Sequence, residues 1–178
     1  MYISELTNSM PDSYTSDFEK RVYEKLNSLN ISFDRVDNDT VEAMEECVEI
    51  SNKLGAEIRK TIIVCNDKKT KFYLVVLPAD KRFDSKAFRD KMGCSRVSFA
   101  RAEDMQEKLG VVPGNATIMS VINDKDGIVQ VVIDKEVADN EFFACNTGEN
   151  TRHIKIKTDD LLNKFLTDVE HEPTIIEL

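Results

Sequence analysis

Histidine is scarce in this chain of 178 residues, where only His153 and His171 occur, far apart in the sequence. Neither lies near a G-x-S-x-G nucleophile signature, and no group of histidines and carboxylates has the spacing of metal ligands. The sequence also lacks a P-loop and a G-x-G-x-x-G segment. These absences argue against a serine hydrolase triad, a metal centre and a dinucleotide site. An enzyme with this sequence would work with few side chains and would require neither a metal nor an organic cofactor.

Long apolar runs are absent as well, because no stretch approaches the ~18 residues that a membrane helix needs. The N-terminal segment is acidic and polar, whereas a signal peptide would be basic and then apolar. We therefore expect a cytoplasmic protein with no membrane partner. The four cysteines form no C-x-x-C pair, and Cys65 and Cys145 lie in apolar, strand-like sequence. This scatter predicts reduced core thiols rather than a disulfide framework or a zinc site.

The charge is unevenly distributed. The net charge is −9, yet residues 58–101 carry twelve basic and four acidic side chains, a local charge of +8 that leaves −17 for the rest of the chain. Such a basic segment in an acidic protein is typical of a face that meets phosphate. A solvated, lysine-rich surface with no ligand explains the same pattern equally well.

Hydrophobic periodicity predicts one α+β domain over residues 15–178, preceded by a loose leader over 1–14. Amphipathic stretches with caps and glycine stops predict helices over 18–29, 39–54, 84–92, 101–109 and 161–166. Short β-branched or alternating runs predict strands over 31–36, 58–65, 71–77, 96–99, 117–122, 128–134, 140–145, 153–156 and 171–178. Residues 123–127 have the composition of a turn that joins 117–122 and 128–134 as a hairpin. The sheet is expected to be mixed and mainly antiparallel.

Two local features point to a ligand. The alternation of a strand places Lys60 on one face with Ile58, Ile62 and Val64, and an inward ammonium needs an anion. Alternatively, the strand is buried on both sides and Lys60 extends to solvent at its end. The loop Gly110–Gly114, with two glycines and a proline, could present bare peptide groups to a bound molecule, or could be an ordinary connection after a glycine helix stop.

Several segments together resemble the YbaK/ProX family, and most closely its free-standing PrdX/ProX branch of trans-editing deacylases. That branch is similar to the insertion domain of bacterial prolyl-tRNA synthetase. The resemblance extends from about Phe18 to Leu178. The segments that carry it, in family order and spacing, are residues 60–64, 73–82, 99–100, 109–114, 121–124, 150–151 and 171–173.

The resemblance implies a twisted, partly barrel-like sheet flanked by helices. It also implies hydrolysis of the ester of mischarged tRNA(Pro), most of all Ala-tRNA(Pro), with serine and cysteine esters as alternatives. A proline pocket discriminates poorly against smaller amino acids, so a second site must destroy the error. The expected partners are the tRNA(Pro) acceptor end and prolyl-tRNA synthetase, and we expect a monomer.

Residue roles follow from the same resemblance. Lys60 would pair with phosphate or ribose near the terminal adenosine, and Gly110 begins the loop whose main-chain groups would hold the aminoacyl end and orient water. These two are the predicted catalytic residues. The predicted substrate-binding residues are Thr61, Val112, Pro113, Gly114, Ser120, Asn123, Asn146 and Asn150. The predicted tRNA-binding residues are Lys68, Lys69, Lys81 and Arg82.

One departure from the family pattern concerns Asn146, which stands where the family commonly has a histidine in a His-Pro segment. The departure bears on amino-acid specificity more than on the reaction. Two other functions stay open at this point. The chain could be a module that binds a tRNA acceptor end or a synthetase without cleaving anything, or an α+β domain with an unrelated small-molecule pocket.

Overall fold

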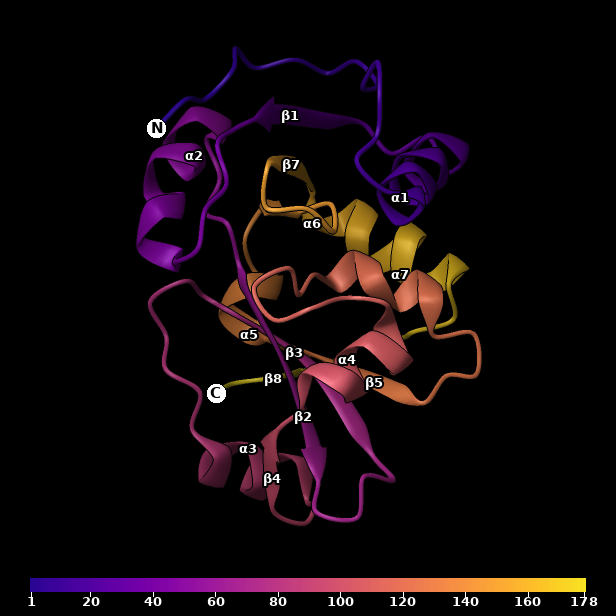
Figure 1. The fold of residues 1–178 in the computed structure, drawn as a ribbon. Coiled ribbons are helices and arrows are strands. Elements are labelled where there is room, and N and C mark those ends of the chain that lie inside the picture. Colours follow the sequence, from indigo (N-terminus) through magenta and orange to yellow (C-terminus); the bar gives the residue numbers. More distant parts are fainter.

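Eight strands divide between two sheets in the computed structural model, which describes all 178 residues (Figure 1). The smaller sheet is antiparallel with the order β1-β7-β6, formed by Phe33–Asp37, Arg152–Lys157 and Phe142–Asn146. The larger sheet has the order β4-β2-β3-β5-β8, formed by Val97–Phe99, Lys60–Asn66, Phe72–Leu77, Val129–Asp134 and Thr174–Ile176. Its first two pairings are antiparallel and its last two are parallel. The predicted α+β class with a mixed, mainly antiparallel arrangement is confirmed.

The two sheets meet at one point and do not close into a barrel. A bridge between Ile58 and Ala144 links the start of β2 to β6, where the Arg59 amide donates to the Ala144 carbonyl at 2.9 Å. Strands β4 and β8 stay at the edges of the larger sheet. The partly barrel-like expectation is therefore wrong, because only this short contact connects the sheets.

Helices cover the sheets largely where periodicity predicts them: α1 (Asp17–Ser28), η1 (Met44–Glu46), α2 (Cys47–Leu54), α3 (Ser85–Met92), α4 (Ala102–Leu109), η2 (Ile118–Asn123), α5 (Lys135–Ala138), α6 (Thr158–Asp160), η3 (Leu161–Phe165) and α7 (Leu166–Asp168). The second predicted helix begins later than expected. The Glu46 carboxylate accepts from the amides of Glu42 and Ala43, so these residues cap the helix instead of entering it. None of the helices is long and apolar enough to span a membrane.

The predicted strand over 117–122 is wrong, because these residues form the 3-10 helix η2. The Thr117 hydroxyl accepts from the Met119 amide, and the Ser120 hydroxyl donates to the Thr117 carbonyl at 2.7 Å, which closes a tight turn. A short, continuous apolar run does not distinguish a buried helix from a buried strand. The expected hairpin is consequently absent, and β5 pairs in parallel with β3.

The main core lies between the two sheets. It contains 27 buried residues, contributed by both sheets, α1, α4, η2 and the C-terminal helix. Strand β3 is buried on both faces, since Leu74 and Val76 face this core whereas Val75 and Leu77 face a second cluster beside α3. Ile62 and Val64 of β2 pack on that second cluster too, so Lys60 starts the strand on the same face, as the alternation predicts.

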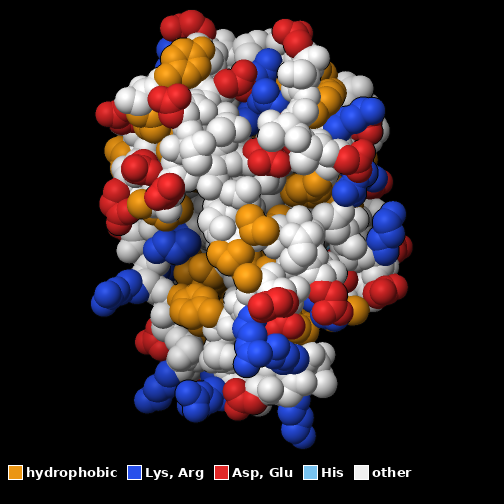
Figure 2. Space-filling view, viewed as in Figure 1, with side chains coloured by type: hydrophobic (Ala, Val, Ile, Leu, Met, Phe, Trp, Pro, Cys, Tyr) orange, Lys and Arg blue, Asp and Glu red, His pale blue; other side chains and the backbone are white.

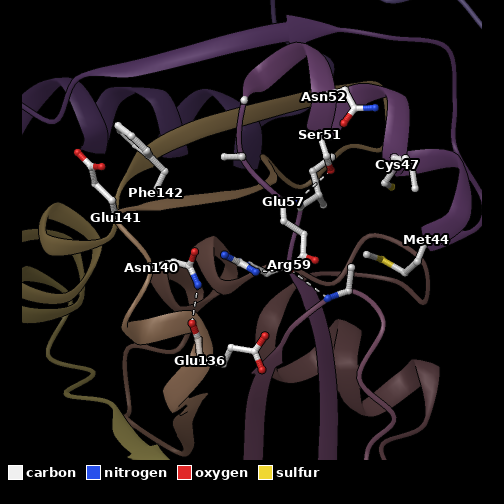
Figure 3. A pocket seen from close by; sticks show the side chains of 15 residues that line it. Met44, Cys47, Ser51, Asn52, Glu57, Arg59, Glu136, Asn140, Glu141 and Phe142 are labelled. Atoms are coloured by element: carbon white, nitrogen blue, oxygen red, sulfur yellow. Dashed lines mark hydrogen bonds and ion pairs between the residues drawn. The ribbon is translucent and has the colours of Figure 1, made fainter.

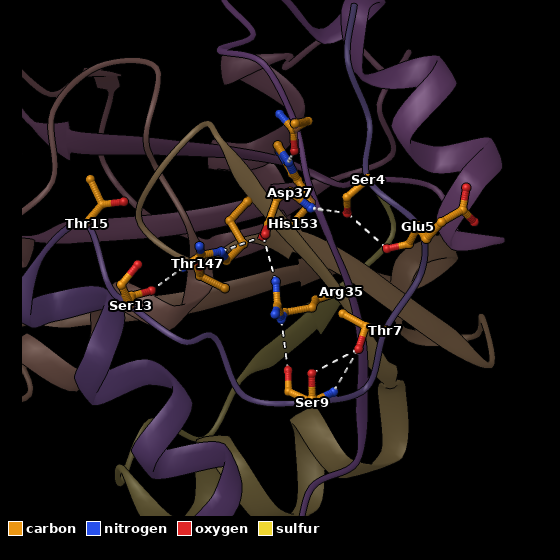
Figure 4. Close-up of polar contacts among 12 residues, drawn as sticks. Ser4, Glu5, Thr7, Ser9, Ser13, Thr15, Arg35, Asp37, Thr147 and His153 are labelled. Carbon is orange, nitrogen blue, oxygen red and sulfur yellow. Dashed lines mark hydrogen bonds and ion pairs between the residues drawn. The ribbon is translucent and has the colours of Figure 1, made fainter.

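Residues 1–14, expected as a loose leader, lie in an extended conformation along β1. Isolated bridges pair Ile3 with Asn38 and Thr7 with Arg35. The Arg35 side chain donates to the Ser9 carbonyl at 2.8 Å and to the Asp37 carboxylate at 2.7 Å, contacts that Figure 4 draws. Backbone pairing of this kind carries no strong sequence signal, because it depends on the exposed edge of β1 rather than on side-chain periodicity.

Candidate active site

A small cavity of about 240 Å³ opens where the two sheets approach each other. The start of β2 forms one wall, the end of β6 and the start of β7 form another, and residues 41–47 and the 114–116 loop complete it. Five of the residues predicted from sequence line this cavity: Lys60, Thr61, Gly114, Asn146 and Asn150. The structure thus brings these five residues together from segments far apart in the chain.

Lys60 is the basic side chain of this cavity that has no carboxylate partner. It is half-buried, and its Nζ donates to the Lys81 carbonyl at 2.7 Å. Lys60 forms no ion pair with a carboxylate, whereas Arg59 pairs with Glu57 and Lys81 pairs with Asp134. An ammonium held by one neutral carbonyl keeps two donors for an incoming anion.

Asn146 faces the cavity, but both ends of its amide are already bonded. Its Nδ2 donates to the Ala116 carbonyl at 3.3 Å, and its Oδ1 accepts from the Gly148 amide at 2.8 Å. The Thr117 hydroxyl donates to the Asn146 carbonyl at 2.8 Å, so the end of β6 is tied to the 116–117 loop. Asn146 therefore holds two loops in place around the cavity.

His153 is a cavity residue that the sequence reasoning missed. It lies in β7 directly opposite Asn146 in the ladder and is only 2% exposed. Its Nδ1 lies 2.9 Å from Oδ1 of Asn38, and the Asn38 amide nitrogen donates to the carbonyls of Asp39 and Asn150. Burial lowers the pKa of His153 to about 4, so the ring is neutral at physiological pH.

The other predicted contacts do not reach the cavity. Gly110, at φ +66°, ends α4, and its amide donates to the Gln106 carbonyl at 3.0 Å. Asn123 supports the same helix end through a bond from its Nδ2 to the Leu109 carbonyl at 2.8 Å. Ser120 is fully buried, and Val112 and Pro113 are exposed outside the lining. The residue that ends the helix, Gly110, and the residue of this loop that lines the cavity, Gly114, are therefore different.

The four predicted tRNA-binding cations lie at two separate places. Lys68 and Lys69 are in the β2–β3 turn, about 20 Å from the cavity end of β2 by the usual rise of a strand. Lys69 pairs with Asp104 at 2.7 Å. Lys81 follows β3, and Arg82 beside it is exposed. Figure 2 shows Lys and Arg side chains projecting from the end of the molecule that carries α3 and the β2–β3 turn.

A second, larger cavity of about 810 Å³ adjoins the first (Figure 3). It lies between α2, the start of β2, α5 and the start of β6, and it shares Met44, Cys47, Ile58 and Arg59 with the smaller cavity. Arg59 is 7% exposed and pairs with Glu57, while its Nε has no partner. The two cavities thus share part of their lining, and Lys60 lines only the smaller one.

Gly148 lies in the turn between β6 and β7, between the cavity residues Asn146 and Asn150. Its φ is +99°, and a Cβ at this position would overlap the Phe18 ring of α1. We expect Gly148→Ala to lower the free energy of unfolding by about 2–3 kcal/mol, measured by urea denaturation. Gly127→Ala is the matched control, because Gly127 has φ +64° and open space around it, so only the backbone cost of about 1 kcal/mol applies. Equal losses in both variants would contradict the contact with Phe18.

Known proteins match most of the length of this chain. The family model of the aminoacyl-tRNA editing domain matches residues 38–164, which include the whole lining of the smaller cavity. The chain is 29% identical over 145 residues to the prolyl-tRNA editing protein ProX of Acetoanaerobium sticklandii, covering 82% of this chain and 88% of that protein.

Solved structures share the fold. The crystal structure of a proposed trans-editing enzyme for prolyl tRNA synthetase superposes with a TM-score of 0.68 at 17% identity, covering 93% of this chain and 98% of that one. The crystal structure of the hypothetical protein APE2540 superposes with a TM-score of 0.67 at 18% identity, covering 87% of this chain and 97% of that one. Because the family model matches well over half of the chain, this protein belongs to the aminoacyl-tRNA editing domain family.

Proposed function

We propose that this protein is a trans-editing deacylase that hydrolyses the ester of mischarged tRNA(Pro), with Ala-tRNA(Pro) as its substrate. The observation that carries the proposal is Lys60, a half-buried ammonium without a carboxylate partner, at the edge of a small cavity. The named function of the ProX relative supports the same reaction. The free protein would act in the cytoplasm, as a monomer, on tRNA released by prolyl-tRNA synthetase.

The volumes of the two cavities suggest that each would bind a different part of the substrate. The smaller cavity of about 240 Å³ suits the aminoacyl group of a small amino acid, and the adjoining space of about 810 Å³ suits the terminal nucleoside. Lys60, which lines the smaller cavity, would bind a ribose oxygen or the 5′-phosphate of the terminal nucleotide, assisted by the exposed Arg82 on the nearby turn. Lys68 and Lys69 would contact only more distant parts of the tRNA.

The reaction needs little from the protein beyond position. An aminoacyl ester is already activated, so main-chain groups near Gly114, the Thr61 hydroxyl and the Asn150 amide could orient the ester and the attacking water. The neighbouring 2′ or 3′ hydroxyl of the ribose can assist. Such a mechanism agrees with a site that contains no nucleophile paired with a base.

The test is release of labelled alanine from pre-formed Ala-tRNA(Pro) at catalytic protein concentration, with the proline, serine and cysteine esters alongside. We expect multiple turnovers on the alanine ester with the proline ester spared, because the small cavity favours a small side chain. Preferred release of serine or cysteine would keep the deacylase and change its substrate. No release from any ester would contradict the proposal.

A second candidate is a module that binds the acceptor end without cleaving it. Asn146 favours this reading, because both ends of its side-chain amide are bonded within the protein, which leaves it less free to contact a substrate. The two functions give opposite results in the same assay. A binding module would slow the spontaneous loss of alanine, whereas a deacylase accelerates it.

A further inference from the structure

We propose that His153 is a further substrate-contacting residue, whose Nε2 accepts a hydrogen bond from the α-ammonium group of the amino acid carried on the tRNA. This inference rests on the proposed deacylase function and names the group that recognises the amino end of the ester. Neither the sequence motifs nor the comparisons assign a role to this residue.

The hydrogen bonds around His153 fix which ring nitrogen carries the proton. The amide nitrogen of Asn38 donates to two carbonyls, those of Asp39 and Asn150, at 2.7 and 2.8 Å. Its oxygen is therefore the atom that faces the imidazole, and this oxygen can only accept. Nδ1 of His153 must consequently be the donor, at 2.9 Å, and Nε2 carries the lone pair.

Nε2 has no partner within the protein. His153 is only 2% exposed, yet it lines the smaller cavity, and Nε2 forms no hydrogen bond with any other group of the chain. An acceptor that is held rigidly from behind by Asn38 and is unpaired in front is the arrangement expected of a ligand-binding atom.

The chemistry of the ester selects the α-ammonium as its partner. This group is the strongest hydrogen-bond donor of an aminoacyl ester, and it is cationic. Lys60 and Arg59, which also line the cavity, would repel it, and the Asn146 oxygen already accepts from the Gly148 amide. The one carboxylate of the lining, Glu42, is exposed at the rim, where water screens its charge. A neutral buried imidazole attracts the ammonium without adding a competing charge.

The experiment compares two esters of the same tRNA in single-turnover reactions. The first is alanyl-tRNA(Pro), and the second is propionyl-tRNA(Pro), which is identical except that it lacks the amino group. We expect His153→Phe, which keeps the ring shape but removes both nitrogens, to slow release of alanine about tenfold or more. It should slow release of propionate by less than about twofold, because that ester has no donor to lose. His153→Gln, whose side-chain oxygen can occupy the place of Nε2, should retain most of the rate with alanine.

Each outcome of this experiment either supports or overturns the role of His153. Equal slowing of both esters by His153→Phe would overturn the inference, since a role in folding or in water activation does not depend on the amino group. An unchanged rate for alanine would overturn it as well, and would leave the deacylase function intact. No release by the unmodified protein would instead overturn the proposed function, and the inference with it. Thermal melts followed by circular dichroism establish that the variants are folded.

Discussion

Replacing Lys60 with alanine is expected to reduce deacylation of the mischarged ester at least about tenfold while leaving the fold intact. Hydrogen bonds to charged groups contribute about 1.5–3 kcal/mol each, and a tenfold rate change requires about 1.4 kcal/mol. The Lys60 ammonium has one protein partner, the Lys81 carbonyl at 2.7 Å, so its remaining donors are available to phosphate or ribose. Single-turnover release of labelled alanine measures the effect.

Lys68→Ala is the matched control for Lys60→Ala. Lys68 is exposed in the β2–β3 turn, at the opposite end of the same strand, and its removal changes the net charge by the same amount. We expect it to alter the rate less than about twofold at moderate ionic strength, since surface charges beyond a Debye length of about 10 Å are screened. Unchanged turnover in Lys60→Ala would remove Lys60 from the site, and equal losses in both variants would point to overall charge.

Local sequence signals located most helices and strands, because their causes are local. The glycine at each of the predicted stops Gly55, Gly93 and Gly110 adopts a left-handed conformation at the end of a helix. The two halves of the β2–β3 hairpin pair as expected, with Lys60 opposite Leu77. The period-two alternation of β2 also placed Lys60 on the same face as Ile62 and Val64, as the structure has it. One residue that lines the cavity could therefore be singled out from the sequence.

The pairing of strands that are distant in the sequence could not be predicted from such local signals. The sequence does not reveal that the strands split into two sheets, or that Ile58 bridges Ala144 where they meet. The cavity lies at this junction, so most of its lining comes from contacts between distant segments. The family resemblance assigned Gly110 and Ser120 to the site, but Gly110 ends α4 and Ser120 lies in the tight 3-10 helix η2, so neither residue lines the cavity.

His153 illustrates the same limit. The family resemblance draws attention to Asn146, where it leads one to expect a histidine, and gives no reason to look seven residues further on. The antiparallel register of β6 and β7 places His153 directly opposite Asn146, so an imidazole still lines the cavity, supplied by the neighbouring strand. Only the register of the ladder connects the two positions.

A buried ionic network supports the strand and turn that carry His153, and its disruption is expected to have the largest effect on stability. Glu19 of α1 is fully buried, and its carboxylate accepts from Arg152 Nη1 at 2.9 Å, from the Thr147 hydroxyl at 3.1 Å and from the Thr15 amide at 2.8 Å. Arg152 also donates to the Asp37 carboxylate at 2.7 Å. The network joins α1, β1, β7 and the β6–β7 turn.

Arg152→Met should lower the free energy of unfolding by about 3–5 kcal/mol, because it leaves the Glu19 carboxylate buried without a cation. Methionine keeps most of the apolar volume, so the loss reports mainly on charge. Urea denaturation followed by circular dichroism at neutral pH measures the change. Lys20→Met is the control: Lys20 pairs with Glu24 at 3.8 Å, both side chains are more than half exposed, and the expected loss is below about 0.5 kcal/mol.

Arg152→Met both removes the contacts of Arg152 and leaves the Glu19 carboxylate buried without a cation. The double variant Glu19→Leu/Arg152→Met separates these two contributions to the loss of stability. If the penalty arises from a stranded carboxylate, then removing that carboxylate should recover a large part of the loss, and the double variant should be more stable than Arg152→Met alone. A double variant that loses the sum of both single changes would show that the two side chains act independently. In that case the turn that holds Gly148 and the strand that carries His153 would depend on packing against α1 rather than on this ion pair.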